Sequence, residues 1–195
     1  MSNVKTICVY CASSTQIDPA YFEAARRVGQ LIAERGITLV NGAGSMGLMA
    51  ASADGCLEHG GRAVGIIPTF MVREGWCHQG MTEIIETENI HIRQEKMAEM
   101  SDAAIVLPGG CGTLAELTEL ITWKQLGIYL KPIILLNTLN YYEPLLRALH
   151  EAARQHFMRE QHTDIWRVAQ TPEEAIELAL TTPLWDTGIR RFAKI

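Results

Sequence analysis

The sequence predicts an α/β fold, a Rossmann-like, doubly wound parallel sheet with helices on both faces. Short apolar segments alternate with amphipathic segments of helical length along most of the chain. The apolar segments lack the polar alternation of a half-exposed strand, which is typical of parallel strands buried on both faces. Glycine-rich loops follow two of these segments, as expected where strands lead into helices in such a sheet.

The first half of the chain alternates strands with helices whose ends carry capping residues. Asp18 and Pro19 mark a helix start, because a carboxylate accepts a backbone N–H there and proline suits the first helical position. Gly36 and Gly60 are placed to end the first two helices. We expect strands at residues 5–10, 37–41, 62–67 and 81–87, helices at 18–35, 48–59 and 90–100, and an irregular segment at 69–80.

The second half continues this alternation. Asn140 and Glu143 have the spacing of a capping box, in which two side chains cap the backbone at a helix start. Thr171 followed by Pro172 marks the start of the final helix. We expect strands at residues 103–107, 132–136 and 165–168, and helices at 114–126, 140–156 and from 171. Residues 1–183 are predicted to form a single nucleotide-binding domain, and residues 184–195 a C-terminal tail.

Composition and charge restrict the class of protein. The 195 residues are 48% apolar and 20% charged, which is ordinary for a soluble globular domain. The net charge of −5 argues against nucleic acid or a membrane surface as a partner, because both require clustered lysine and arginine. No secretory signal and no apolar run of about 18 residues is visible. Five cysteines, an odd number, favour reduced thiols, so we expect a cytoplasmic protein.

The cysteines and histidines do not predict a metal site. Cys8 and Cys11 have the C-x-x-C spacing, but a separation of three residues along a strand places their side chains on opposite faces. The six histidines form no cluster with each other or with cysteine. We therefore expect neither zinc binding nor thiol redox chemistry.

The first glycine loop, Gly42 to Gly47, lies between a predicted strand and a predicted helix and has the pattern G-x-G-x-x-G. Glycines there let the backbone approach a phosphate at the helix N-terminus. We favour substrate contacts from Gly42, Gly44 and Ser45 over the alternative of a closely packed tight turn. A nicotinamide-dependent oxidoreductase is a further alternative, but the motif follows the second strand and no Asp or Glu ends the next one.

The second glycine loop, residues 108–116, follows an apolar strand and opens a helix. Its three glycines in the four positions 109–112 suit an anion held by backbone N–H groups. The alternative is that Thr113 and Glu116 form a capping box. A capping box does not explain the three glycines, each of which costs conformational entropy.

Charged side chains accompany the second loop. Glu116, Glu119 and Thr122 lie on one stripe of a helix that is otherwise strongly apolar, and a carboxylate on a largely buried helix is a candidate functional group. Arg93 is suited to bind a phosphate through two parallel hydrogen bonds. The alternative, which the sequence pattern alone favours, is that Arg93 lies on its helix surface near two glutamates.

The most specific motif in the chain is P-G-G-x-G-T-x-x-E at residues 108–116. It occurs with further motifs at residues 8–14, 42–49, 65–68, 93–97, 121–127 and 131–132. In this order the motifs resemble those of the Lonely guy (LOG) family, the cytokinin riboside 5′-monophosphate phosphoribohydrolases. Gln94 departs from the family pattern, which usually has lysine after the motif arginine.

The resemblance implies a homodimer of Rossmann-like subunits that hydrolyses the N-glycosidic bond of a cytokinin riboside 5′-monophosphate or AMP. The products would be an adenine-type base and ribose 5-phosphate, with no cofactor and no required metal. The resemblance assigns Arg93 and Glu116 as catalytic. Together with the residue pattern, it predicts substrate contacts at Glu74, Arg93, Gln94, Gly109, Gly110, Cys111, Gly112, Thr113, Glu116, Glu119, Thr122, Gly42, Gly44 and Ser45.

Two other functions are alternatives to this hydrolase. A non-enzymatic nucleotide or cofactor carrier would keep both glycine loops without using Arg93 or Glu116, and Gln94 favours this alternative. A pyridoxal-phosphate decarboxylase requires a lysine for the Schiff base. None of the five lysines lies in either glycine loop.

Overall fold

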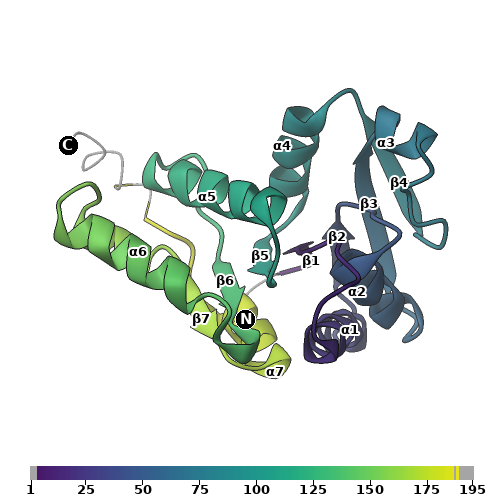
Figure 1. Cartoon of the computed structure of the whole chain (residues 1–195), viewed down its shortest axis with the longest axis horizontal. Coiled ribbons are helices and arrows are strands. Elements are labelled where there is room, and N and C mark those ends of the chain that lie inside the picture. The colour runs from purple at the N-terminus through teal and green to yellow at the C-terminus, as the bar shows by residue number, and fades with distance from the viewer. Residues whose placement is uncertain (1–3, 187, 189–195) are drawn as a thin grey trace.

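The structure is a computed structural model that describes residues 4–186 and 188. Its centre is a parallel seven-stranded sheet with the order β4-β3-β2-β1-β5-β6-β7 (Figure 1). The strands are β1 (Thr6–Tyr10), β2 (Thr38–Asn41), β3 (Arg62–Pro68), β4 (Glu83–Thr87), β5 (Ala103–Val106), β6 (Ile133–Leu136) and β7 (Arg167–Ala169). The helices are α1 (Pro19–Glu34), α2 (Gly47–Leu57), α3 (Thr69–Arg73), α4 (Ile90–Met100), α5 (Cys111–Gln125), α6 (Glu143–Arg154) and α7 (Pro172–Thr181), with short 3₁₀ helices at Thr138–Asn140 and Glu160–Asp164.

Helices cover both faces of the sheet (Figure 1). Helices α1, α2 and α7 enclose one core, which includes Val28, Leu48 and Ile176. Helices α4 and α5, with the inner side of α6, enclose the other core around Met97 and Leu117. This arrangement confirms the predicted doubly wound α/β fold.

Capping residues fix two of the helix starts as predicted. The Asp18 carboxylate accepts a hydrogen bond from Ala20 N at 2.9 Å, and Pro19 is the first residue of α1. Thr171 Oγ1 accepts a hydrogen bond from Glu174 N at 3.2 Å at the start of α7. These bonds satisfy N–H groups that have no partner within the helix.

Two helices begin where the sequence did not predict them. Helix α3 lies within the segment that we expected to be irregular. Helix α5 begins at Cys111, three residues before the predicted start, because the extended backbone of Gly110 forms its N-cap. The alternative of a capping box formed by Thr113 and Glu116 is therefore excluded, since Thr113 already lies inside the helix.

The predicted capping box at Asn140 is also wrong. Asn140 adopts a left-handed conformation with φ of 58° in the turn before α6. Asn137 supplies the polar side chain instead, since its Oδ1 accepts from Tyr142 N at 2.8 Å and its Nδ2 donates to Glu143 Oε1 at 3.0 Å. The sequence spacing identified the right turn but not the residue that stabilises it.

The chain order of the strands reverses between β1 and β5. From β1 the chain proceeds through β2, β3 and β4 in one direction, and β5 returns to the other side of β1. Loops at the carboxyl ends of such a pair diverge and leave a crevice in which α/β proteins bind ligands. Backbone hydrogen bonds from Leu107 N to Tyr10 O (2.9 Å) and from Ala12 N to Pro108 O (3.3 Å) hold the two loops side by side.

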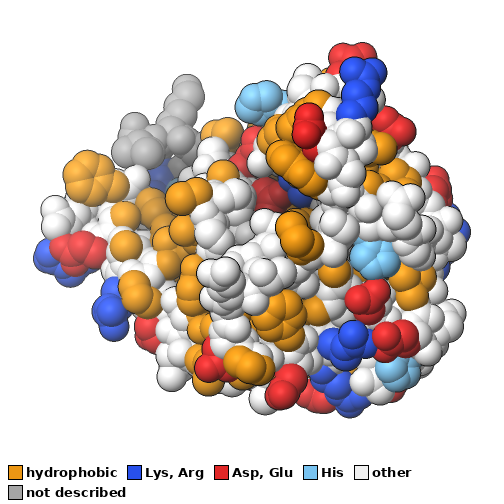
Figure 2. Space-filling model, turned by 45° about the vertical axis from the view of Figure 1, so that its right-hand side comes forward, with side chains coloured by type: hydrophobic (Ala, Val, Ile, Leu, Met, Phe, Trp, Pro, Cys, Tyr) orange, Lys and Arg blue, Asp and Glu red, His pale blue; other side chains and the backbone are white. Residues whose placement is uncertain are grey.

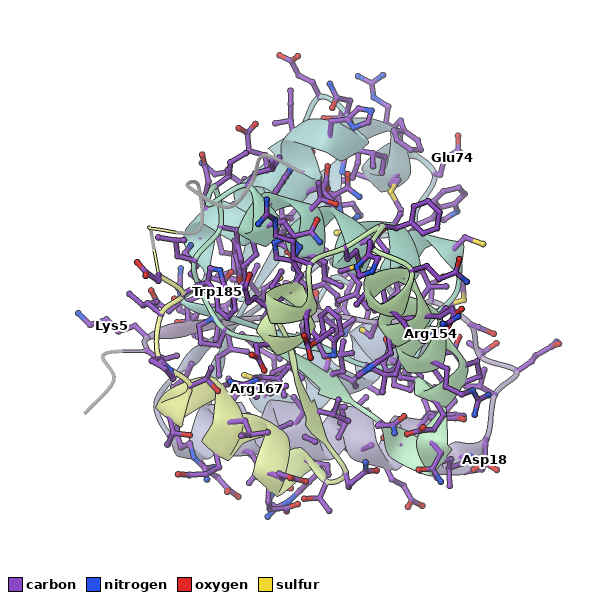
Figure 3. All side chains as sticks on the ribbon, turned by 90° about the vertical axis from the view of Figure 1, so that its left-hand side faces the viewer. Lys5, Asp18, Glu74, Arg154, Arg167 and Trp185 are labelled. Carbon is purple, nitrogen blue, oxygen red and sulfur yellow. The ribbon has the colours of Figure 1, made fainter. Side chains whose placement is uncertain are left out.

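The start of the predicted C-terminal tail packs against the domain. Trp185 N donates to Leu130 O at 2.7 Å, and Lys124 Nζ lies 5.5 Å from the centroid of the Trp185 ring (Figure 3). Residues 187 and 189–195 of the tail lie outside the described residues. Within residues 4–186 and 188, no helix has the length and apolarity to cross a lipid bilayer.

Candidate active site

A cavity of about 380 Å³ opens at the carboxyl end of the sheet, at the reversal between β1 and β5. Its size lies in the range of small-molecule sites. Segments that follow β1, β2 and β5 line it together with α3 and α4. The lining residues are Val9, Tyr10, Cys11, Ala12, Ser13, Ser14, Gly42, Met49, Met71, Arg93, Met97, Gly110, Cys111, Gly112, Thr113 and Glu116.

Arg93 and Glu116 form an ion pair in the cavity wall. Arg93 Nη1 donates to Glu116 Oε1 at 2.9 Å, and Arg93 Nε donates to Ile66 O at 3.1 Å. The side chains of Arg93 and Glu116 are only 11% and 8% exposed. The alternative of a surface arginine near Glu95 and Glu99 is therefore wrong.

Burial and the neighbouring charges shift the pKa of the Glu116 carboxyl group. Burial raises the pKa of Glu116, while the adjacent Arg93 guanidinium opposes that rise and Glu119 adds to it. Because Oε1 is bound to Arg93, Oε2 is the oxygen of Glu116 that is left to interact with a molecule in the cavity. Such a carboxylate, held beside a cation in a cleft, has the properties of a catalytic group.

The N-terminus of α5 forms a cradle next to Glu116. Gly110 is the N-cap, and no side chain caps the helix. Apart from the adjoining residues and the nearby backbone of the helix itself, no described atom lies within 4 Å of the place where a Cβ would stand at Gly110 or Gly112. Neither residue has a positive φ, so neither the backbone conformation nor packing requires glycine there. The open space and the free N–H groups at the helix start suit an anion.

Side-chain hydrogen bonds from two tyrosines stabilise the loop that carries this cradle. Tyr141 Oη donates to Gly109 O and Tyr142 Oη donates to Leu107 O, both at 2.6 Å. Gly109 itself makes room for Thr113, whose Oγ1 would lie 2.1 Å from a Cβ at position 109. These contacts fix the cradle before any ligand arrives.

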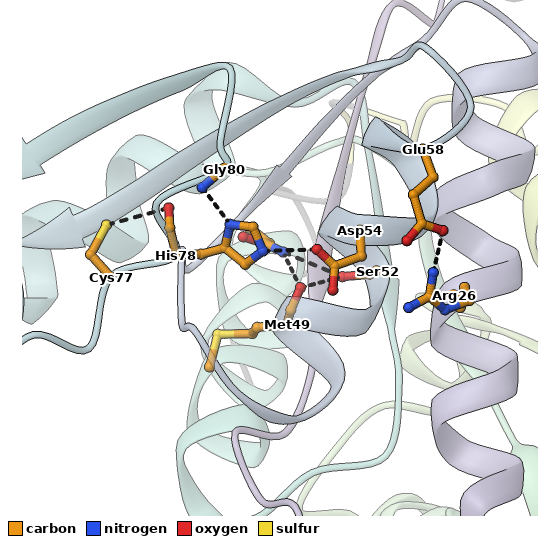
Figure 4. A network of polar contacts seen from close by, with 9 residues as sticks. Arg26, Met49, Ser52, Asp54, Glu58, Cys77, His78 and Gly80 are labelled. Carbon is orange, nitrogen blue, oxygen red and sulfur yellow. Dashed lines mark hydrogen bonds and ion pairs between the residues drawn. The ribbon is translucent and has the colours of Figure 1, made fainter.

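Two of the three predicted positions in the first glycine loop make backbone contacts with the segment after α3. Ser45 N donates to Trp76 O at 2.9 Å, and Gly44 forms an antiparallel bridge with Cys77. The segment after α3 is further fixed by His78, whose Nε2 lies 2.9 Å from Asp54 Oδ1 (Figure 4). Gly42 is the member of this loop that lines the cavity.

Four other predicted contacts lie away from the cavity lining. Glu74 is exposed at the outer edge of the molecule (Figure 3). Thr122 is exposed and its Oγ1 donates to Thr118 O. Gln94 and Glu119 share a narrow crevice with Glu116, separate from the cavity.

Sequence reasoning missed several residues of the cavity wall. Ser13 and Ser14 follow β1 and bring exposed hydroxyl groups to it, and Met49 and Met71 contribute thioethers. The two serines can be identified as cavity residues because β1 lies beside β5. That neighbourhood is known only once the strand order is known. Within the described part of the chain, no three His, Cys, Asp or Glu side chains are grouped to hold a metal ion.

The sheet order and the cavity at its reversal define a Rossmann-like α/β protein with a candidate anion site. A model of the family described as "Possible lysine decarboxylase" matches residues 49–179. The chain is 39% identical to the probable cytokinin riboside 5′-monophosphate phosphoribohydrolase LOGL2 of Oryza sativa subsp. japonica, over 90% of this chain and 72% of that protein. It is 44% identical to the cytokinin riboside 5′-monophosphate phosphoribohydrolase LOG7 of Arabidopsis thaliana, over 80% and 72%. The chain therefore belongs to the LOG family, as the sequence motifs predicted.

Solved structures of similar fold include molybdenum cofactor proteins. The molybdenum cofactor binding protein of Rippkaea orientalis superposes with a TM-score of 0.68 at 26% identity, over 89% of this chain and 93% of that one. The molybdenum cofactor carrier protein of Chlamydomonas has a TM-score of 0.67 at 21% identity, over 88% and 92%, which shows a shared fold alone.

Proposed function

We propose that this protein hydrolyses the N-glycosidic bond of a nucleoside 5′-monophosphate with an adenine-type base, a cytokinin riboside 5′-monophosphate or AMP. The products are the free base and ribose 5-phosphate. The observation that carries the proposal is the position of Glu116, which is ion-paired to Arg93 in the wall of a cavity that also contains the open cradle of Gly110 and Gly112. The LOG relatives, named for this reaction, support it.

The cradle at the start of α5 is the proposed phosphate site. The N–H groups of the first helical turn and the positive end of the helix dipole attract an anion. The hydroxyl groups of Ser13 and Ser14 stand in the same cavity and can add hydrogen bonds. Phosphate binding at a distance from the reacting bond positions the ribose beside Glu116.

Glu116 is the proposed catalytic carboxylate. Cleavage of the C1′–N bond moves its electron pair to the base and leaves positive charge on the ribose. An ionised Glu116 stabilises that charge and takes a proton from the water that forms the new C1′–O bond. Arg93 holds Glu116 in place and favours its ionised form. The leaving base takes up a proton from solvent water, and Glu116 returns to solvent the proton that it accepted, which regenerates the carboxylate.

The family description raises the alternative of a lysine decarboxylase. Pyridoxal-phosphate chemistry requires a lysine amine at the cofactor. Among the described residues no lysine lines the cavity, and Lys124 and Lys131 donate to backbone carbonyl groups elsewhere. The described residues thus place no lysine in this cavity for such a reaction.

A non-enzymatic carrier remains the second candidate, because the Rippkaea orientalis protein of similar fold binds molybdenum cofactor. A carrier needs the anion cradle but not an ionised carboxylate next to the bound sugar. Release of free base from a nucleoside 5′-monophosphate therefore separates the two functions.

We also propose that the protein is a cytoplasmic homodimer. Phe70 and Trp76 pack edge to face with ring centroids 6.5 Å apart, and both side chains remain about half exposed. Hydrophobic side chains reach the surface in several patches on the face drawn in Figure 2. Exposed apolar groups of this kind suit an interface with a second copy of the chain, and light scattering of the purified protein measures its mass.

The test of the proposed reaction is the variant Glu116→Gln. The purified variant and its parent are incubated with AMP and with isopentenyladenosine 5′-monophosphate, and free base is measured by chromatography. We expect base release to fall by about 10²- to 10⁴-fold, because the amide neither stabilises the ribosyl charge nor accepts the proton. Glu95→Gln, at an exposed position of α4, is the matched control. Base release by Glu116→Gln at the parent's rate would refute the role of Glu116.

A further inference from the structure

The Arg93 guanidinium is enclosed by β3, by helix α5 and by the loop after β2. Its Nε donates to the carbonyl oxygen of Ile66 in β3, and its Nη1 donates to Glu116, which follows β5. Its Nη2 lies against Gly42, which follows β2. A Cβ at position 42 would stand 2.0 Å from Nη2 and 3.0 Å from Cζ of Arg93.

The backbone conformation does not account for glycine at position 42. Gly42 has no positive φ, so an L-residue could adopt its conformation. The loop around it is fixed, because Ala43 N donates to Asn41 Oδ1 at 2.9 Å and Gly44 is bridged to Cys77. A methyl group at position 42 would therefore displace the guanidinium, since the backbone has no freedom to retreat.

We propose that Gly42 is a positioning residue for Arg93, and that the first glycine loop serves the Arg93–Glu116 pair instead of binding phosphate. The absence of a side chain at position 42 lets the guanidinium reach Glu116 at the cavity wall. The effect of Gly42 on turnover rests on the proposed function. Its effect on the position of Arg93 does not.

The first measurement is base release by Gly42→Ala. We expect kcat to fall by about 100-fold, because a displacement of about 1 Å at a catalytic group has an effect of that size. KM should change less, since the phosphate cradle at Gly110 and Gly112 lies in the other glycine loop. A kcat equal to that of the parent, in a parent that releases base, overturns the proposal.

The second measurement is a double-mutant cycle in melting temperature, which needs no activity. Gly42→Ala is made in the parent and in the Arg93→Ala variant, where the added methyl group enters the space that the guanidinium left. We expect Gly42→Ala to lower Tm in the parent but not in Arg93→Ala. Gly44→Ala is the matched control, because the three atoms nearest to a Cβ there all belong to the flexible side chain of Met49 and none to Arg93, so its change in Tm should be equal in both backgrounds.

The cycle separates positioning from a general structural role. An equal loss of Tm from Gly42→Ala in both backgrounds overturns the proposal, because the glycine would then act independently of Arg93. If the parent releases no base from any nucleotide, the proposed function fails, whereas the Tm cycle still decides whether Gly42 positions Arg93.

Discussion

Tyr142 donates its buried hydroxyl group to the carbonyl oxygen of Leu107 at 2.6 Å. Leu107 directly follows β5 and precedes the glycine loop that forms the anion cradle. Tyr142 N is in turn bound to Asn137 Oδ1, so a turn at the start of α6 supports the cradle loop from 35 residues away in sequence. Tyr142 therefore supports the cradle loop, although it does not line the cavity itself.

The first prediction concerns this contact. Tyr142→Phe leaves the buried Leu107 carbonyl without its donor, which costs about 1–3 kcal/mol. For a chain of this size each kcal/mol lowers Tm by about 2–4 °C, so calorimetry should show a decrease of several degrees. Tyr141→Phe is the control, because Tyr141 is 39% exposed and water can replace its bond to Gly109. Equal decreases for both variants would contradict the argument.

The second prediction concerns the buried amine of Lys124. Lys124 is 1% exposed and donates to Lys131 O at 2.7 Å. Burial lowers its pKa from 10.5 to about 8, and the positive charge of Arg167 contributes in the same direction. Between these two values the unfolded chain binds more protons than the folded one, so Lys124 makes stability rise with pH from about 8 to about 10.5.

The variant that tests it is Lys124→Met. Below pH 8 the folded protein carries a buried charge that methionine lacks, and replacement of such a charge by an apolar group is often neutral or stabilising. The Tm of Lys124→Met minus that of the parent should fall by several degrees as pH rises from 8 to 10. Lys5→Met, at an exposed position, is the matched control. A difference that stays constant over this pH range would rule out a lowered pKa for Lys124.

The third prediction concerns the dependence of Glu116 on Arg93. Removal of one partner of a buried ion pair leaves an uncompensated charge, which costs about 3–5 kcal/mol. Because burial raises the pKa of Glu116 and Arg93 opposes that rise, Arg93→Ala should raise the pKa further. Because the pKa of Glu116 is higher in the folded than in the unfolded state, its protonation stabilises the fold at pH values below the unfolded-state pKa. This stabilisation is lost as the pH rises through the folded-state pKa.

Denaturation of Arg93→Ala at pH 5 and pH 8 measures this effect. We expect the variant to lose more stability, relative to the parent, at pH 8 than at pH 5. The double variant Arg93→Ala/Glu116→Gln should recover much of the loss at pH 8, because the glutamine carries no charge. A loss that is independent of pH and is not recovered would show that Arg93 acts through packing alone.

The sequence predicted most of the fold because its signals are local. Continuous apolar segments identified the strands, and Asp18 with Pro19 identified the start of α1, since a cap and its helix lie within a few residues of each other. The wrong prediction of a capping box at Asn140 has the same origin. A residue with suitable spacing was present, but α6 begins at Glu143 and Asn140 lies in the turn before it.

The sequence by itself determined the cradle, because its glycines, its helix start and Glu116 lie close together in one short segment of the chain. Only the tertiary structure decided the partner of Arg93, which lies 23 residues from Glu116, while glutamates lie two and six residues further along its own helix. It also decided what the first glycine loop contacts, because Ser45 N donates to Trp76 O and Gly44 is bridged to Cys77. Trp76 and Cys77 lie about 30 residues further along the chain, and the local pattern of the loop does not predict these contacts.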